Sequence, residues 1–526
     1  MIKTDLTLPY GYSSDELKDA ISSRLPISKD EIKEIRILKR ELVVRDGQPP
    51  VYKSTVAFSS DIAKEEGLLK IRNKAFLYED DPFLVKQSSF YLRPVVAGAG
   101  PAGLFAALTL AESGACPVVL ERGLDVENRA KRIELFNTLG VLDTECNVQF
   151  GEGGAGTYSD GKLKTGAKDK YKYKVLDEFI EGGADETIAY SSTAHLGTDK
   201  LPGIVAHIRN KIISLGGEFI FSARLTDITI DNGALSGVKY EKEGEVIELA
   251  TDTLILAIGH SARDTISMLK ERGLPMKAKG FGIGMRIEHP REYINGIVYR
   301  DSAPLIEETA SYHLVTHLDN GRSVYSFCMC PGGHVVAATS AEGAIVTNGM
   351  SEYSRRADNS NAALLVSVTP DDFGSDDPLA GIAMQQRIER AAYAVTGSYK
   401  APSIRLADLC TDGRPASVGV RPSYPIGTEL VAPSEYLPHF IPESIVAAMP
   451  DFDAWLNGYN YGDATLTGPE TRTTSPVRIE RDSNGYAEGF IGIYPTGEGA
   501  GYAGGIVSSA VDGIRMAEKA VEKHLK

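Results

Sequence analysis

VVAGAGPAGLFAALTLAESGACPVVLERG, residues 95–123, is the stretch that decides the fold. A short apolar strand, a glycine turn, a helix and a second apolar strand follow one another, which is the order of a parallel α/β unit. Gly98, Gly100 and Gly103 form a G-x-G-x-x-G pattern between the first strand and the helix. The pattern predicts a tight turn at the first glycine, a close backbone approach at the second and close helix–strand packing at the third.

The same stretch predicts a dinucleotide site. A helix that starts after a glycine turn offers free N–H groups and a partial positive charge to a pyrophosphate, and Pro101 and Ala102 lie in its first turn. Glu121 ends the second strand, where a carboxylate accepts hydrogen bonds from ribose hydroxyls and repels a 2′-phosphate. Arg122 follows it and is included in the predicted site. We therefore expect FAD or NAD, the alternative being a purely structural glycine turn.

Two further glycine-rich loops favour FAD. NVQFGEGGAGTYSDGKLKTG, residues 147–166, contains Gly153 and Gly154, whose amides suit a pyrophosphate or a flavin edge. The third loop joins a strand to a helix near the C-terminus, and a buried strand ends at Gly259; the candidate residues of the third loop are Gly497, Glu498, Gly499, Gly501, Gly504 and Gly505. NAD needs one such loop, so three loops suit an extended, non-covalently bound FAD better. A flexible linker and an ordinary strand–helix connection are the alternatives.

The composition is that of a large globular protein. The chain has 526 residues, of which 42% are hydrophobic, enough to bury a large core. The net charge of −15 argues against nucleic acid as a partner. Five scattered cysteines suggest no disulfide framework, the N-terminal residues show no secretory signal, and no motif indicates a membrane span or a metal site. We expect a cytoplasmic protein that acts on a small molecule; the sequence leaves its oligomeric state open.

The pattern along the chain predicts an α/β fold class with four parts. Residues 1–90 predict a small N-terminal α+β module of βαβ or ferredoxin-like type. Residues 91–265 predict the first part of a Rossmann-like FAD-binding domain, and residues 466–526 predict its C-terminal part. Between them the pattern is irregular, and residues 266–465 predict an inserted α+β substrate-side domain. The FAD-binding domain is thus expected to be built from discontinuous segments.

Four residues outside the glycine loops are candidates for catalysis. Cys328 and Cys330 occupy positions i and i+2 of the predicted strand SVYSFCMC and are expected to face the same side. They are a redox pair, a lining of the flavin pocket, or buried small hydrophobes. His334 is a candidate proton donor or acceptor near neutral pH, and Arg472 is a candidate for binding a substrate carboxylate with two parallel hydrogen bonds. A structural role is the alternative for both.

The chain resembles the uncharacterised bacterial FAD-dependent dehydrogenases, also called NAD(FAD)-utilising dehydrogenases, of the glutathione-reductase-like FAD/NAD(P)-binding superfamily. The resemblance rests on GAGPAGLFAAL, FGEGGAGTYSDGKL, SFCMCPGGHVV, TRTTSPVRIERD and IYPTGEGAGYAGGIVSSAVDG. It implies a discontinuous FAD domain, an inserted substrate-side domain and an N-terminal module, but it supplies no substrate. It also implies that Gly98, Gly100, Gly103 and Glu121 serve the adenosine and pyrophosphate, Gly153 and Gly154 the second loop, and Glu498 with Gly499–Gly505 the flavin-proximal loop.

These observations predict an FAD-dependent oxidoreductase that transfers a hydride between an unknown organic substrate and flavin N5. The protein then supplies orientation, electrostatics and exclusion of water. A second half-reaction must restore the flavin, and transient binding of NAD(P)H as the electron donor stays open. The alternative is an FAD-loaded, redox-responsive binding or regulatory protein without rapid turnover.

Overall fold

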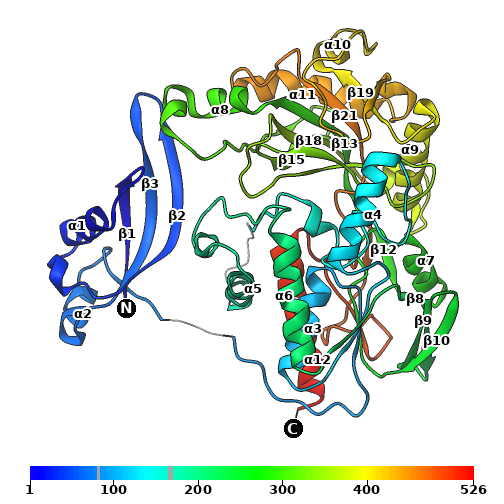
Figure 1. Ribbon diagram of the computed structural model, residues 1–526, viewed down its shortest axis with the longest axis horizontal. Helices are drawn as coiled ribbons and strands as arrows, with labels where there is room; N and C mark the ends of the chain where they lie inside the picture. Colours follow the sequence, from blue (N-terminus) through cyan, green and yellow to red (C-terminus); the bar gives the residue numbers. More distant parts are fainter. Residues whose placement is uncertain (80–82, 164–169, 526) are drawn as a thin grey trace.

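The structure, a computed structural model, describes residues 1–79, 83–163 and 170–525 (Figure 1). Its organising element is a five-stranded parallel sheet in the order β23-β11-β5-β6-β7. The strands are β5 (Val95–Ala97), β6 (Val118–Leu120), β7 (Glu218–Ile220), β11 (Leu254–Leu256) and β23 (Ile493–Pro495). Because β23 comes from the C-terminal region and pairs with β11, the end of the chain completes the sheet.

Both faces of the parallel sheet are covered, which explains the uninterrupted apolar runs in its strands. Val96, Val119 and Ile255 pack against helices, whereas their neighbours in sequence pack on the opposite side. The helical layer contains α3 (Pro101–Glu112), α5 (Lys170–Glu181), α6 (Leu201–Ser214) and α12 (Ile506–Lys523), of which α6, α3 and α12 lie side by side (Figure 1). The other layer contains β8 (Arg224–Asp231), β9 (Ala234–Lys242), β10 (Glu245–Ala250) and α7 (Arg263–Glu271).

A second, larger sheet has seven strands in the order β14-β15-β18-β13-β21-β19-β20. All its pairings are antiparallel except the one between β19 and β20. Helices α9 and α11 contribute to its core. The strands are β13 (Phe281–Pro290), β14 (Val315–His317), β15 (Ser323–Cys330), β18 (Asn359–Val368), β19 (Ala401–Arg405), β20 (Thr428–Leu430) and β21 (Thr465–Glu470), and the helices are α8 (Arg291–Tyr299), α9 (Ala380–Thr396), α10 (Leu406–Thr411) and α11 (Phe440–Trp455).

Shorter elements connect the two sheets. Helix α4 (Val126–Leu139) begins after Asp125, whose carboxylate accepts a hydrogen bond from the N–H of Asn128, and ends at Gly140 with φ of 68°. Two small ladders pair β12 (Met276–Ala278) with β22 (Val477–Ile479) and β16 (His334–Ala337) with β17 (Thr347–Met350). Within the described ranges, no helix combines the length and the apolar character that crossing a membrane requires.

The N-terminal module stands apart in Figure 1, in blue, and touches the rest of the chain near α8. It contains β1 (Ile2–Pro9), α1 (Ser14–Arg24), β2 (Ile35–Arg45), β3 (Gln48–Phe58), α2 (Ile62–Leu69) and β4 (Phe76–Leu77). Its antiparallel sheet has the order β2-β3-β1-β4. A β-α-β-β-α-β chain with this sheet order has the ferredoxin-like topology.

The two boundaries predicted for the inserted domain, at residues 266 and 465, both fall within elements. Residue 266 lies inside α7, which packs Leu269 into the core beside β8. Residue 465 is the first residue of β21, which pairs with β13 through Glu470. Helix α7 therefore belongs with the parallel sheet, and the seven-stranded sheet extends to residue 470.

Candidate functional site

A deep cleft opens at the carboxyl ends of the parallel strands. It encloses about 1530 Å³ of empty space, including its mouth. Gly98 after β5, Glu121 after β6, Gly259 after β11 and Glu498 after β23 all line it, and so do residues of the loop 149–162. Open α/β sheets bind their ligands at this end, so the fold itself directs a ligand to this cleft.

Two helices begin at the cleft with no side chain capping them. Helix α3 starts after Gly100 and α12 starts after Gly505. Gly100 has φ of −75°, which any residue adopts, and a Cβ added there would find its nearest contact at 3.7 Å, the Cα of Gly154. A Cβ added at Gly505 would contact nothing within 4 Å. The glycines thus leave open space in front of free N–H groups, which fits an anionic group such as the pyrophosphate of FAD.

Other glycines of the predicted site are required by packing within the protein. A Cβ on Gly98, whose φ is +102°, would lie 2.4 Å from the carbonyl oxygen of Ala257. A Cβ on Gly103 would lie 1.8 Å from the carbonyl oxygen of Gly98. These are the tight turn and the close helix–strand contact that the pattern predicts. In the third loop, Cβ atoms on Gly497, Gly499 and Gly501 would each lie within 3 Å of protein atoms.

The Glu121 carboxylate joins three segments of backbone around the cleft. One oxygen accepts the N–H of Ala99 at 2.8 Å, and the other accepts the N–H groups of Gly123 and Gly151, both at 2.9 Å. A carboxylate has about four acceptor positions, so these bonds leave one for a ribose hydroxyl. The sequence predicted only the ribose role. The structure adds a second one, since Glu121 fixes the first and second glycine loops to each other.

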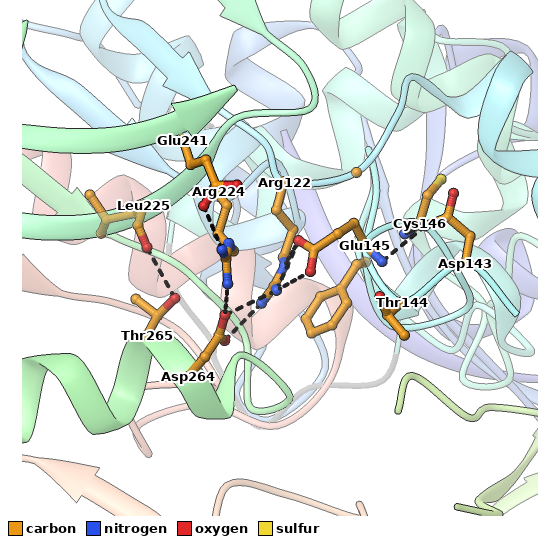
Figure 2. Close-up of polar contacts among 12 residues, drawn as sticks. Arg122, Asp143, Thr144, Glu145, Cys146, Arg224, Leu225, Glu241, Asp264 and Thr265 are labelled. Atoms are coloured by element: carbon orange, nitrogen blue, oxygen red, sulfur yellow. Dashed lines mark hydrogen bonds and ion pairs between the residues drawn. The ribbon is translucent and has the colours of Figure 1, made fainter. Parts of the chain in front are cut away.

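Arg122, which lines the cleft, lies in an ion-pair network (Figure 2). Its guanidinium donates to Glu145 at 2.9 Å and to Asp264 at 3.0 Å, and Asp264 also accepts from Arg224 at 2.9 Å. The guanidinium carbon lies 4.0 Å from the centre of the Phe150 ring. Because the Arg122 N–H groups donate to carboxylates, the guanidinium offers a ligand mainly its planar face and a fixed positive charge.

Residues 280–473 match a protein family described as "FAD-dependent protein, C-terminal domain-like". Over 518 residues the chain is 44% identical to an uncharacterized protein of Clostridium beijerinckii, and the match covers 96% of both chains. The chain belongs to the same family as this clostridial protein.

Solved structures resemble the chain much more loosely. One is a flavoprotein/dehydrogenase from Cytophaga hutchinsonii, with 12% identity and a TM-score of 0.35, covering 83% of this chain and 79% of that one. Another is a quinol fumarate reductase from E. coli, with 12% identity and a TM-score of 0.36, covering 83% of this chain and 71% of that one. Because these TM-scores are low, the two similarities assign no function to the chain.

The predicted cofactor residues divide into two groups in the structure. Those that line the cleft are Gly98, Gly100, Pro101, Ala102, Glu121, Arg122, Gly154, Gly259, Glu498 and Gly505. Those outside the lining are Gly103, Gly153, Gly497, Gly499, Gly501 and Gly504. Of the predicted loop 147–166, residues 164–166 lie outside the described residues.

Cys328 lines the cleft, whereas Cys330 is completely buried. The sequence predicted that both would face the same side, but the pairing register of β15 with β18 shifts between Phe327 and Cys330, and Cys328 has φ of 40°. Such a β-bulge re-aims side chains. The Sγ of Cys330 turns back and donates to the carbonyl oxygen of Cys328 at 3.2 Å.

The surroundings of Cys328 favour its thiolate. A hydrogen bond from the Cys330 thiol and the positive charges of Arg286 and Lys162 outweigh burial and lower the pKa of Cys328 to about 6. The Lys162 ammonium donates to the neighbouring carbonyl of Met329. Lys162 also lines the cleft, and no sequence signal linked it to Cys328, because the two lie far apart in the chain.

Glu498 lies in the same part of the cleft. Burial raises the pKa of its carboxyl to about 7, although Lys279 and the amide of Gly505 act in the opposite direction. His260 is a further lining residue that sequence reasoning missed; burial and the charge of Arg472 lower its pKa to about 3, so its imidazole is neutral at physiological pH. Glu498, like Cys328, therefore exchanges a proton near neutral pH.

The other two catalytic candidates contribute differently from what was predicted. Arg472 lines the cleft, but four of its N–H groups donate to protein: two to Glu389 at 2.9 and 3.1 Å, one to Ser340 at 2.5 Å and one to Ser261 at 3.2 Å. It has no paired N–H groups left for a substrate carboxylate and acts as a structural cation. His334 begins β16 and does not line the cleft.

We predict that Cys328 is alkylated at a pH where ordinary thiols are protonated. Because its pKa is lowered to about 6, iodoacetamide labelling should rise through pH 6 and level off above pH 7. Cys410 is exposed as a residue, but partial desolvation raises the pKa of its thiol, so it should label only at higher pH. Mass spectrometry of the labelled peptides measures both. Cys330→Ala removes the hydrogen-bond donor and should shift the Cys328 midpoint upward; a wild-type midpoint above pH 8 would contradict the assignment.

Proposed function

We propose that the chain is an FAD-dependent oxidoreductase that exchanges a hydride between flavin N5 and a small organic substrate. The observation that carries the proposal is a single cleft in which two uncapped helix starts, at Gly100 and Gly505, meet Cys328 and Glu498. The match of residues 280–473 to an FAD-dependent family supports the same cofactor. FAD, when bound, supplies the two-electron chemistry that none of these side chains has alone.

The residues that would hold FAD are those around the helix starts. The N–H groups at the start of α3, facing the space left by Gly100 and Gly154, suit the pyrophosphate. The remaining acceptor position of Glu121 suits a ribose hydroxyl. The start of α12, after Gly505, offers positive potential to the electron-rich part of a reduced ring.

The chain's own residues would manage charge and protons beside the substrate. With a pKa raised to about 7, Glu498 both gives and accepts a proton near neutral pH. Cys328 presents a thiolate, and Lys162 presents a positive charge that can pair with an anionic substrate or with that thiolate. We propose further that the substrate is a small soluble molecule, that neither nucleic acid nor membrane is a partner, and that the protein is cytoplasmic.

Flavin reconstitution followed by anaerobic mixing tests the proposal. The purified chain should bind FAD without a covalent bond, so that acid precipitation releases the flavin into the supernatant. Mixing with a panel of reductants, including NADH and NADPH, should bleach the flavin absorbance within seconds. Later mixing with acceptors should restore the absorbance equally fast. A chain that does not take up FAD would refute the proposal. A chain that holds FAD but bleaches only over hours with every pair would instead favour a redox-responsive binding protein.

A further inference from the structure

A second cleft lies between the N-terminal module and the rest of the chain. It encloses about 2070 Å³ of empty space, including its mouth. One wall consists of module residues, among them Arg40 and Tyr52, and the others come from segments 187–195, 298–311 and 353–356. No site was predicted here from the sequence, because the module by itself carries no chemical motif.

The module is held in place by specific contacts around this cleft. The backbone N–H of Arg40 donates to the carbonyl of Tyr190 at 2.8 Å, and the N–H of Ser192 donates back to the carbonyl of Arg40 at 2.9 Å. The hydroxyl of Tyr52 donates to Glu308 at 2.5 Å, and the hydroxyl of Tyr10 donates to the other oxygen of the same carboxylate. Fixed walls distinguish this cleft from a gap between loosely joined parts.

Aromatic rings line the cleft in stacked pairs. The rings of Tyr10 and Tyr52 lie 5.4 Å apart with an interplanar angle of 27°. Among the lining residues outside the module, the rings of His195 and Tyr353 lie 5.2 Å apart with an angle of 22°. Tyr52 is buried against Tyr10 and Arg40, whereas Tyr353 is exposed and Tyr10 is partly exposed, so these two rings offer flat surfaces on which a planar ligand can stack.

The second cleft also contains arginine side chains that form no ion pair with the described residues. Its charged lining residues are Arg40, Arg355, Arg356, Glu307 and Glu308. Arg355 forms a bidentate ion pair with Asp160. Among the described residues, neither Arg40 nor Arg356 forms an ion pair, and the Arg40 guanidinium instead lies 4.9 Å from the ring centre of Tyr52 and 5.0 Å from that of Tyr190. The carboxylate of Glu308 is held by the hydroxyls of Tyr10 and Tyr52, so the guanidinium groups of Arg40 and Arg356 are available to pair with an anionic ligand.

We propose that this second cleft binds a planar aromatic molecule that carries an anionic group, either a phosphate or a carboxylate. The anionic group pairs with the guanidinium of Arg40 or Arg356, and the ring stacks on Tyr10 or Tyr353. The site borders the first cleft, because Asp160 lines the first cleft and its ion-pair partner Arg355 lines the second. Ligand binding here does not depend on the proposed redox reaction.

Titration calorimetry on the full-length, FAD-loaded chain tests the proposal. Adenosine monophosphate and 4-hydroxybenzoate are the anionic probes, and adenosine and phenol are their uncharged counterparts. At least one anionic probe should bind saturably, and its uncharged counterpart should bind about tenfold more weakly or worse. Binding of the nucleotide alone would identify a phosphate ligand, and binding of the benzoate alone a carboxylate ligand.

Variants on one strand provide the matched comparison. Arg40→Met keeps most of the bulk of the side chain but removes the charge, so affinity for the bound probe should fall about tenfold. Lys39→Met, on the same strand but with its ammonium paired to Glu41 outside this cleft, should leave affinity unchanged. Arg356→Met, at an exposed position, repeats the test without affecting folding. The proposal is overturned if no probe binds below millimolar concentration, if the uncharged probes bind as well as the anions, or if Lys39→Met matches both arginine variants.

Discussion

Gly100→Val is expected to abolish FAD binding while leaving the fold of the FAD-free chain intact. The backbone at Gly100 has φ of −75°, which valine adopts without strain, and the nearest atom to an added Cβ is 3.7 Å away. The branched side chain would therefore fit the protein but occupy the space in front of helix α3. Its cost to the FAD-free protein is the weaker helix cap, about 1 kcal/mol.

Thermal unfolding with and without FAD measures this effect. A ligand at a hundredfold excess over its Kd stabilises a native protein by about 2.7 kcal/mol, so the wild-type melting temperature should rise on addition of FAD. The variant should show no rise and should purify without colour. Gly98→Val is the control for a structural glycine: its φ is +102° and its Cβ would lie 2.4 Å from a carbonyl oxygen, so that variant should unfold at a lower temperature even without FAD. A Gly100→Val protein that retains FAD would show that the cofactor lies elsewhere.

The contrast between these two glycines shows what a local sequence pattern can predict. The roles of Gly98 and Gly103 follow from contacts within one strand–turn–helix, and the structure has both contacts as expected. Strand β23 lies more than two hundred residues after β11, the strand with which it pairs. It was nevertheless predictable, because its apolar run and the glycine loop after it repeat the pattern of the first strand and loop.

Contacts between distant segments were not predictable in the same way. Arg472 was a candidate for binding a substrate carboxylate because it lies shortly before the third glycine loop, but the fold brings Glu389 to it from α9. The bulge that separates Cys328 from Cys330 depends on the register with β18, which hydrophobic alternation does not specify at a single residue. The second cleft forms only where the N-terminal module packs against the rest of the chain, and no local sequence pattern predicts that contact.

Glu389 joins the two main parts of the molecule and supports the first cleft. Its carboxylate accepts two hydrogen bonds from Arg263 of α7, both at 2.8 Å, and two from Arg472, at 2.9 and 3.1 Å. Arg472 itself lines the cleft and Arg263 follows the lining residue Ala262, and the Glu389 side chain is 1% exposed. Burial opposes its ionisation, but the charges of Arg472 and Arg263 hold the pKa of Glu389 well below its usual range.

We predict that Glu389→Gln is strongly destabilising, because it leaves two guanidinium groups in the interior without a counter-charge. Removing one partner of a buried ion pair typically costs about 3–5 kcal/mol. Urea unfolding followed by circular dichroism should show a loss of this size. Lys270→Gln provides the control on helix α7, which also carries Arg263: its partner Asp377 is about half-exposed, and such surface pairs contribute about 0.2–1 kcal/mol.

The pH dependence of the stability loss in Glu389→Gln tests whether the missing charge causes that loss. Since the pKa of Glu389 is lowered in the folded chain, its carboxylate stabilises the native state fully above its unfolded pKa, near 4.5, and progressively less as the pH falls below that value. The gap in unfolding free energy between wild type and Glu389→Gln should therefore be constant from pH 6 to 8 and should narrow below about pH 4.5. A gap that stays the same at acidic pH would mean that glutamine disturbs packing rather than charge, and the buried triad would then not be what holds the two sheets together behind the cleft.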